Sequence, residues 1–475
     1  MKKAALHNLG CKVNSYETEV MQQKLQEKGY RIVPFDSKAD IYIVNTCTVT
    51  GIADRKSRQM LHRAKQLNPD AVVVAAGCYV QTGQSDLEKD ECVDLCIGNN
   101  RKGDIAEILE EYFRQQKQAA ENTDLAAGEN EEGGSGETRP CHRESDKTLG
   151  GRTIPDIGHE AGYEELQLRQ TAEHTRVYIK VQDGCNQFCS YCAIPYARGR
   201  VRSRRAEDIL TEVRALTETG YKEIVLTGIH ISSYGIDFDN ERYSGHSRLT
   251  ELVEEIHEVP GIERIRLSSL EPRVVTADTA RRLAALPKFC PHFHLSLQSG
   301  CDATLKRMNR HYTTGEYYTG VEYLRSAFEH PAITTDVIVG FPGETEEEFE
   351  QTKEFLEKVN FYEMHIFKYS RRRGTPAADM PGQVPEEIKR LRSNELSAME
   401  KRQSEGFRRT YIDREAEVLL EDTAEIGGEL WRIGHTKDYV RVAVKAAEAP
   451  PANTIVRVKV QGFLTEEVMM SQPKT

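Results

Sequence analysis

The sequence has a single tryptophan among 475 residues, and it contains no long apolar run. No stretch approaches the roughly 20 apolar residues that a membrane-spanning helix needs, so we expect no membrane segment. The first ten residues hold too short an apolar run for a secretory signal, which favours a cytoplasmic location. The net charge is −11 at pH 7, so any contact with a nucleic acid has to come from local basic patches.

The sequence also lacks an even number of cysteines, since it contains eleven. Without an export signal, this number indicates reduced thiols and metal binding rather than disulfides. Cys185, Cys189 and Cys192 form the pattern C-x3-C-x2-C, and no fourth cysteine follows nearby. This spacing predicts a 4Fe–4S cluster with three iron ligands and one iron open to a small molecule. A zinc site is the alternative, although zinc usually takes paired C-x2-C halves or a histidine at matching spacing.

Residues 1–112 alternate short apolar runs with helical patterns, which is typical of a doubly wound parallel α/β domain. Cys11, Cys47 and Cys78 directly follow the first three expected strands. The carboxyl ends of parallel strands meet at one edge of a sheet, so we expect these thiols to meet and to bind a second cluster. The alternative is that each cysteine is a small buried residue at a strand end.

Residues 113–175 break this pattern with a run rich in Gln, Glu, Ala and Gly. Such a composition buries too little apolar surface to offset the entropy of ordering, so the sequence predicts a flexible linker or insertion. Cys141 lies in this run as a lone thiol. The sequence assigns no role to it or to the remaining four cysteines, which are Cys92, Cys96, Cys290 and Cys301.

Residues 176–385 contain six expected strand–helix units, too few for a complete eight-unit barrel, and they predict an open partial (βα) barrel. The central cysteine motif follows the first strand, on the face where such folds keep their active sites. The turn that begins at Gly340 lies on the same face and lets a nucleoside approach the backbone closely. Thr345 and Glu348 also fit a capping box that opens a helix.

Arginines crowd the segment after the central motif and recur after the sixth strand. They either contact nucleic-acid phosphates or belong to a solvated, salt-bridged surface. These residues are Arg198, Arg200, Arg202, Arg204, Arg205 and Arg371–Arg373. A charged helical connector over residues 386–408 then leads to short alternating segments over 409–470, which predict a small β-barrel.

Four motifs resemble the radical S-adenosylmethionine methylthiotransferases, a likeness that covers nearly the whole chain outside the linker. They are Gly10-Cys-Lys-Val-Asn14, Asn45-Thr-Cys47, Gly77-Cys78 and Asp183-Gly-Cys-Asn-Gln-Phe-Cys-Ser-Tyr-Cys192. The resemblance implies an N-terminal cluster domain, a central partial barrel and a C-terminal TRAM domain that grips the substrate. It implies two 4Fe–4S clusters, with S-adenosyl-L-methionine on the open iron of the central one.

Within that family, Ile194–Arg200 and Thr227–Gly235 are similar to the branch that acts on N6-threonylcarbamoyladenosine in the tRNA anticodon stem-loop. The implied reaction adds a methylthio group to C2 of the base. The C2–H bond is too strong and too weakly acidic for an ordinary base, which is why a radical cofactor is required. The resemblance also implies a reductant such as flavodoxin or ferredoxin as a partner.

The resemblance also implies the residues that contact S-adenosyl-L-methionine. Tyr191 is similar to the residue beside the adenine, and the adenosine-binding turn corresponds to Gly340, Gly343 and Glu344. Asp336 departs from the pattern, because glycine is common at that position.

Other functions stay open on the sequence alone. One is methylthiolation of isopentenyladenosine in tRNA or of a ribosomal-protein aspartate; the Lys-Val pair between Cys11 and Asn14 argues against both, by resemblance only. Another is a non-enzymatic iron–sulfur electron carrier, which would leave the open ligand sets and the third domain without a purpose. The last is an RNA-binding scaffold with a structural metal.

Overall fold

The computed structural model describes residues 1–127, 147–149, 151–160, 162–169, 175–238 and 247–474. The chain divides into two compact units. Unit 1 comprises residues 1–168 together with Ala193–Arg200, and unit 2 comprises Arg169–Cys192 and Val201–Thr475. The short segment that directly follows the central cysteine motif therefore belongs to unit 1. Among the described helices, none is long and apolar enough to cross a membrane.

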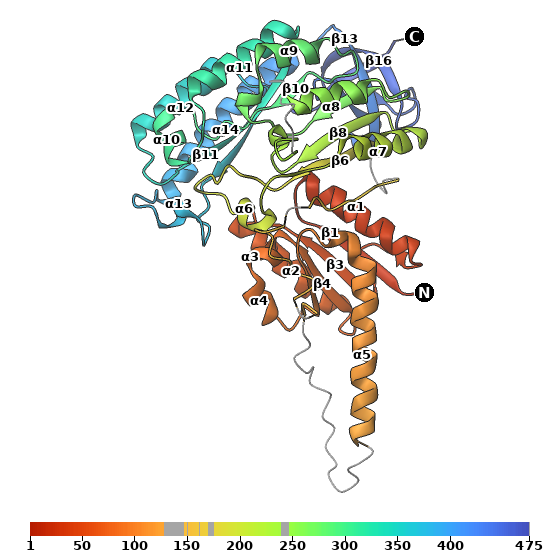
Figure 1. Ribbon diagram of the computed structural model, residues 1–475. Helices are drawn as coiled ribbons and strands as arrows, with labels where there is room; N and C mark the ends of the chain where they lie inside the picture. The colour runs from red at the N-terminus through yellow and green to blue at the C-terminus, as the bar shows by residue number, and fades with distance from the viewer. Residues whose placement is uncertain (128–146, 150, 161, 170–174, 239–246, 475) are drawn as a thin grey trace. The chain divides into compact units, whose positions relative to one another are not determined.

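The described residues of unit 1 form a five-stranded parallel sheet in the order β2-β1-β3-β4-β5 (Figure 1). Its strands are β1 (Lys3–Asn8), β2 (Arg31–Ile32), β3 (Ile41–Thr46), β4 (Val72–Gly77) and β5 (Leu95–Ile97). This is the order of a doubly wound α/β fold, in which helices cover both faces of the sheet. All six residues of β3 are buried, as a strand covered on both faces requires.

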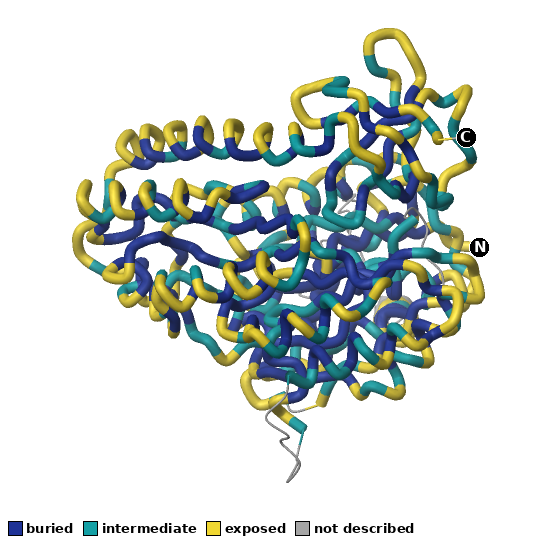
Figure 2. The backbone as a smooth tube through the Cα atoms, turned by 90° about the horizontal axis from the view of Figure 1, so that it is seen from above, coloured by how far each residue is buried: buried dark blue, intermediate teal, exposed yellow. Residues whose placement is uncertain are grey.

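Helices cover the two faces of this sheet. They are α1 (Lys12–Glu27), α2 (Gly51–Leu67), α3 (Cys78–Thr82), α4 (Gln84–Glu88), α5 (Ile105–Ala127) and α6 (Ile194–Arg198), with a 3-10 turn η1 at Lys102–Asp104. Ile43 of β3 packs in one core with side chains of α1 and α5. The next residue, Val44, packs in a second core with side chains of α2 and α3. Alternate residues of one strand thus pack into two cores. In Figure 2 the buried parts of the backbone are drawn in dark blue.

Parts of residues 113–175, where the sequence predicts a flexible linker, are helical or buried. Helix α5 continues to Ala127, well past residue 112. Leu149 joins the core beneath α1 and α5, and Leu166 and Leu168 are also buried. The Tyr16 hydroxyl donates to the Leu166 carbonyl at 2.7 Å. A few apolar anchors in a polar run were enough to order these parts, and Cys141 lies outside the described residues.

The described residues of unit 2 contain six parallel strands that follow one another in chain order. Strands β6 (Arg176–Asp183), β8 (Glu223–Gly228) and β9 (Arg264–Leu267) form one sheet, with the short β7 (Arg202–Ser203) antiparallel at its edge. Strands β10 (His292–His294), β11 (Ala332–Val339) and β12 (Glu363–Lys368) form a second sheet. Two isolated parallel bridges, Ile265 to Phe289 and Leu270 to Leu295, join the neighbourhoods of β9 and β10.

Helices alternate with these strands. They are α7 (Ala206–Glu218), α8 (Arg248–His257), α9 (Ala277–Ala284), α10 (Asp302–Arg307), α11 (Thr314–Ala327), α12 (Glu346–Val359) and α13 (Pro376–Asp379), with 3-10 turns η2 (Ile231–Ser233) and η3 (Pro272–Val274). The predicted capping box of α12 is confirmed. The Thr345 side chain accepts from the Glu348 amide, and the Glu348 carboxylate accepts from the Thr345 amide.

The C-terminal part of unit 2 is rich in β-structure. The predicted helical connector is confirmed as α14 (Glu386–Arg409). It leads to a closed barrel of β13 (Glu415–Ile426), β14 (Glu429–Thr436), β15 (Arg441–Lys445), β16 (Ile455–Phe463) and β17 (Met469–Pro473). Buried Arg264 and Arg266 of β9 donate to backbone carbonyls of this barrel, including those of Glu417 and His435. The barrel therefore docks near the amino end of β9, away from the carboxyl ends that carry the site.

Candidate functional site

Cys11, Cys47 and Cys78 form what we call the N-terminal cysteine site. Cys11 caps α1 directly after β1, Cys47 follows β3, and Cys78 starts α3 after β4. Because β1, β3 and β4 are neighbours in the sheet, their carboxyl ends bring the three residues to one edge. Burial, together with the nearby Cys78 and Cys11, raises the pKa of Cys47 to about 11. The thiols are therefore close enough to interact electrostatically.

The motifs around these cysteines fit together through glycine and asparagine. The Asn14 amide donates to the Thr46 carbonyl at 2.9 Å, and the Asn45 amide donates to the Asn14 carbonyl at 3.0 Å. A Cβ on Gly10 would meet the Asn14 amide nitrogen at 2.2 Å, and one on Gly77 would meet the Asn45 amide oxygen at 2.5 Å. Gly77 also has φ +95°, a conformation that favours glycine. This packing explains why each cysteine of the N-terminal cysteine site stands beside a glycine or an asparagine motif.

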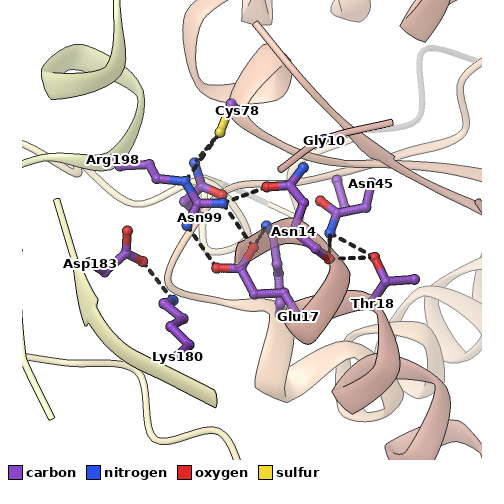
Figure 3. Close-up of polar contacts among 12 residues, drawn as sticks. Gly10, Asn14, Glu17, Thr18, Asn45, Cys78, Asn99, Lys180, Asp183 and Arg198 are labelled. Atoms are coloured by element: carbon purple, nitrogen blue, oxygen red, sulfur yellow. Dashed lines mark hydrogen bonds and ion pairs between the residues drawn. The ribbon is translucent and has the colours of Figure 1, made fainter. Parts of the chain in front are cut away.

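A buried arginine reaches the N-terminal cysteine site (Figure 3). The Arg198 Nε donates to the Cys78 sulfur at 3.3 Å. Its two terminal nitrogens donate to Glu17 Oε1 and to Asn14 Oδ1, both at 2.7 Å. The Asn99 amide adds a contact of 3.6 Å to the same sulfur. A guanidinium and an amide that point at the sulfur are the kind of hydrogen-bond donors that orient a metal-binding thiolate.

Most arginines of the segment after the central motif are buried rather than exposed at the surface. Arg198, Arg202 and Arg204 are buried, with relative exposures of 0%, 1% and 2%. Arg204 pairs with Glu212, and Arg202 lies 3.8 Å from Asp183. For these three residues both alternatives from the sequence, phosphate contact and a solvated face, are wrong. Buried carboxylates distant in sequence compensate the charges, and a charge run read alone does not reveal such partners.

Cys185, Cys189 and Cys192 form the central cysteine site, on the loop after β6 at the carboxyl end of the sheet. The loop is tight, because the Cys192 amide donates to the Cys189 carbonyl at 3.0 Å. Burial, together with the neighbouring Cys189, raises the pKa of Cys185 to about 11. The Arg310 guanidinium donates to the Cys189 sulfur at 3.2 Å. Three thiols and one cationic donor suit a 4Fe–4S cluster held by three cysteines.

The residues expected beside S-adenosyl-L-methionine lie next to this loop. The Tyr191 ring meets the Phe341 ring edge to face, with centroids 6.3 Å apart. Gly340 and Gly343 have φ of +70° and +76°, so the turn needs glycine at both positions. The structure therefore brings Tyr191 and this turn together.

Glu344 has a structural position within that turn. Its carboxylate accepts from the Gly340 amide at 2.6 Å and from Arg392 at 2.7 Å. Burial raises its pKa, while the Gly340 and Arg392 contacts lower it. Glu344 thus holds the turn in place.

A cavity of about 610 Å³ lies beside the central loop and is lined in part by Gln187, His230 and Glu271. Burial, together with the positive charges of Arg310 and Arg273, lowers the pKa of His230 to about 4. His230 is therefore neutral at physiological pH. Sequence reasoning did not single out His230, Arg310 or Asn99, because no spacing pattern links them to the cysteines.

Two family descriptions match separate parts of the chain. Residues 179–356 match the radical SAM superfamily, and residues 3–98 match a family described as uncharacterized protein family UPF0004. The first match covers most of the six parallel strands and the central cysteine site. The second covers the sheet of unit 1 and the N-terminal cysteine site.

Several curated proteins resemble the chain over most of its length. A Bacillus subtilis (strain 168) protein named threonylcarbamoyladenosine tRNA methylthiotransferase MtaB is 37% identical, and the match covers 97% of this chain and 94% of that protein. A protein of the same name from Aquifex aeolicus (strain VF5) is 38% identical, with 88% and 92% covered. An Opitutus terrae protein named tRNA-2-methylthio-N(6)-dimethylallyladenosine synthase is 35% identical, with 90% and 89% covered.

Among solved structures, the radical S-adenosylmethionine methyltransferase TsrM from Kitasatospora setae, with cobalamin and a 4Fe-4S cluster bound, is similar in fold. The TM-score is 0.51 at 16% sequence identity, and the match covers 79% of this chain and 77% of that one.

Proposed function

Because the chain belongs to the radical S-adenosylmethionine methylthiotransferase family, we propose that it adds a methylthio group to C2 of N6-threonylcarbamoyladenosine in tRNA. One observation carries this proposal: two separate three-cysteine sites stand in a chain that matches proteins named for this reaction almost end to end. One such site suffices for a radical enzyme that only removes a hydrogen atom. Delivery of sulfur as well gives the second site a purpose.

The central cysteine site would bind a 4Fe–4S cluster and S-adenosyl-L-methionine, and the N-terminal cysteine site would bind a second 4Fe–4S cluster. When bound, these groups supply the one-electron and sulfur chemistry that the C2–H bond demands. The residues of the chain would position these groups. Arg198 and Arg310 each donate to a cysteine sulfur, and the Tyr191–Phe341 pair forms an apolar wall beside the glycine turn. The six cysteines, Tyr191, Gly340 and Gly343 are the residues to which we assign the cofactors.

The remaining parts of the chain have proposed roles as well. We assign the six parallel strands of unit 2 to a partial barrel, and the C-terminal closed barrel to a TRAM domain that grips the tRNA anticodon stem-loop. The domain boundaries given for the sequence, the cytoplasmic location and a reductant such as flavodoxin or ferredoxin stay predictions.

Methylthiolation of dimethylallyladenosine is the second candidate. Proteins named for that reaction are also 33% to 35% identical over most of the chain, for example those of Acetivibrio thermocellus and Opitutus terrae. The two reactions share their chemistry and differ only in the substituent on N6 of the adenine.

The test is an anaerobic assay with the reconstituted protein, S-adenosyl-L-methionine and a strong reductant. Two anticodon stem-loops serve as substrates, one with threonylcarbamoyladenosine and one with dimethylallyladenosine. Mass spectrometry of the digested nucleosides should find the methylthio product only with the first RNA. A product only with the second RNA would replace the proposed substrate, and no product with either would overturn the proposed reaction.

A further inference from the structure

Three polar side chains on adjacent strands of unit 2 face one another. Asp336 of β11 is the register partner of His365 on β12, and His294 of β10 pairs with Thr334, two residues before Asp336. The two imidazole rings are nearly parallel, with centroids 5.7 Å apart and an interplanar angle of 24°. His294 Nε2 lies 3.4 Å from Asp336 Oδ2. We call His294, Asp336 and His365 the lumen triad.

The lumen triad points away from the helix-covered side of the sheet. The intervening residues Thr335 and Val337 are fully buried, and Phe293 packs against Phe289 and Phe328. Asp336 keeps 29% of its side-chain surface exposed, and His365 is exposed. Since successive side chains of a strand point to opposite faces, the triad occupies the face that the helices leave open.

A ligand can reach this face. Glu363 and His365 line a cavity of about 700 Å³ that extends to Arg408 of α14 and to the loop between β16 and β17. His365 therefore stands at the wall of an open space rather than in a sealed core.

The lumen triad is also close to the central cysteine site. Arg310, which donates to the Cys189 sulfur, reaches the Ser296 carbonyl with its other terminal nitrogen at 3.5 Å. Tyr312 donates to the same carbonyl at 2.7 Å. Ser296 stands only two residues after His294, a rise of roughly 7 Å in extended chain. Asp336 in turn precedes the Gly340 turn by four residues. The triad thus lies just behind the reacting end of the strands.

The chemistry of the triad suits one of the two candidate substituents on N6. His294 already has partners, because Nδ1 lies 3.0 Å from the Thr334 hydroxyl and Nε2 lies 3.4 Å from Asp336. A dimethylallyl group has no polar atom, so it would cover the His365 ring and the Asp336 carboxylate without offering either of them a hydrogen bond, which is costly once water is displaced. A threonylcarbamoyl group carries a carboxylate that accepts from the His365 imidazole. It also carries a hydroxyl and urea N–H groups that donate to Asp336. A site that hydrogen-bonds a substituent rejects analogues that lack it.

We propose that His294, Asp336 and His365 form the subsite that binds the threonylcarbamoyl group and selects this substrate. The inference rests on the proposed substrate.

The test compares reconstituted wild-type protein with His365→Phe and Asp336→Asn. The first variant keeps an aromatic ring but loses the donor, and the second keeps the shape but loses the charge. We expect kcat/KM for the threonylcarbamoyladenosine RNA to fall about 10- to 100-fold in each, mainly through KM, as the loss of a hydrogen bond to a charged group predicts. Deoxyadenosine formation without RNA should stay unchanged in His365→Phe, since His365 lies outside the turn assigned to S-adenosyl-L-methionine. His62→Phe is the matched control, because His62 pairs with Asp90 at 2.8 Å on the surface of unit 1.

Iron content and circular dichroism establish that each variant is folded and loaded. Should His365→Phe fail to fold, His365→Gln carries the same prediction. Variants with unchanged kcat/KM overturn the subsite, provided that the wild-type protein modifies this RNA. A wild-type protein inactive on this RNA overturns the proposed function instead. The donor atoms of the triad lie within 4.8 Å of one another, so stoichiometric zinc that is lost in His365→Phe would identify a metal site and also overturn the subsite.

Discussion

The two cysteine sites are built in opposite ways. The central cysteine site lies on one loop after one strand, whereas the N-terminal cysteine site collects Cys11, Cys47 and Cys78 from the ends of three strands. Each nevertheless has a cysteine sulfur that accepts from an arginine, Arg310 in unit 2 and Arg198 in unit 1. A short motif needs only a local turn, while a dispersed site needs the whole sheet. The dispersed site therefore depends on the fold of its unit, and the local one depends much less on it.

The largest effect should come from removing one site at a time. The variant with Cys185, Cys189 and Cys192 changed to alanine should form neither deoxyadenosine nor methylthiolated RNA. The variant with the three N-terminal cysteines changed to alanine should still cleave S-adenosyl-L-methionine but should form no methylthio product. Chromatography of both products from the same reaction makes this comparison. Equal losses in the two variants would contradict a division of labour between the sites.

Loss of Arg198 should damage the N-terminal cysteine site alone. Arg198→Met leaves Glu17 in the buried network with Lys102 and removes a cation from a buried ion pair, which costs about 3–5 kcal/mol. We expect unit 1 to unfold at a lower urea concentration and the protein to bind less iron. Arg198→Lys should restore part of both properties. Arg310→Met should instead alter the electron paramagnetic resonance signal of the central cluster. If Arg198→Met altered the signal of the central cluster and Arg310→Met destabilised unit 1, the contrast between the two sites would be contradicted.

The tight packing around the N-terminal cysteine site should be measurable as a loss of unfolding free energy at a single glycine, Gly77. In Gly77→Ala the new methyl group would meet the Asn45 amide oxygen at 2.5 Å and the Thr46 carbonyl oxygen at 2.8 Å. Together with φ +95° this should cost about 1–3 kcal/mol of unfolding free energy. Gly29→Ala is the matched control, since Gly29 has φ +83° and nothing lies within 4 Å of its added Cβ. Similar losses of unfolding free energy in both variants would mean that backbone strain, and not the contact with Asn45, causes the effect.

The last effect is absent at neutral pH and concerns His230. Its pKa is about 4 in the folded state, below the ordinary value of 6.5, because of burial and nearby arginines. The unfolded chain therefore binds more protons between these values, and stability falls as the pH drops from about 6.5 to 4, by up to about 3 kcal/mol. His230→Gln should remove this part of the pH dependence in denaturant titrations of unit 2. An unchanged pH profile would exclude His230 as its source.

The features that could be predicted from the sequence are those that depend on local residue patterns. The C-x3-C-x2-C loop, the capping box of α12 and the connector helix each depend on neighbouring residues. The strand-end positions of the N-terminal cysteines followed from strand–helix alternation. The buried networks did not follow, because Arg198 meets Glu17 across 181 residues and no periodicity links them. The buried leucines of the presumed linker were missed for a related reason, since composition averages over isolated anchors such as Leu166.

Iron analysis with Mössbauer spectroscopy tests the central claim most directly, applied to the reconstituted protein and to both triple-alanine variants. Two cuboidal clusters predict about eight irons per chain in the unmodified protein and about four in each variant, with a 4Fe–4S spectrum throughout. A wild-type protein that saturates at four irons, or a triple variant that keeps all eight, would contradict the account.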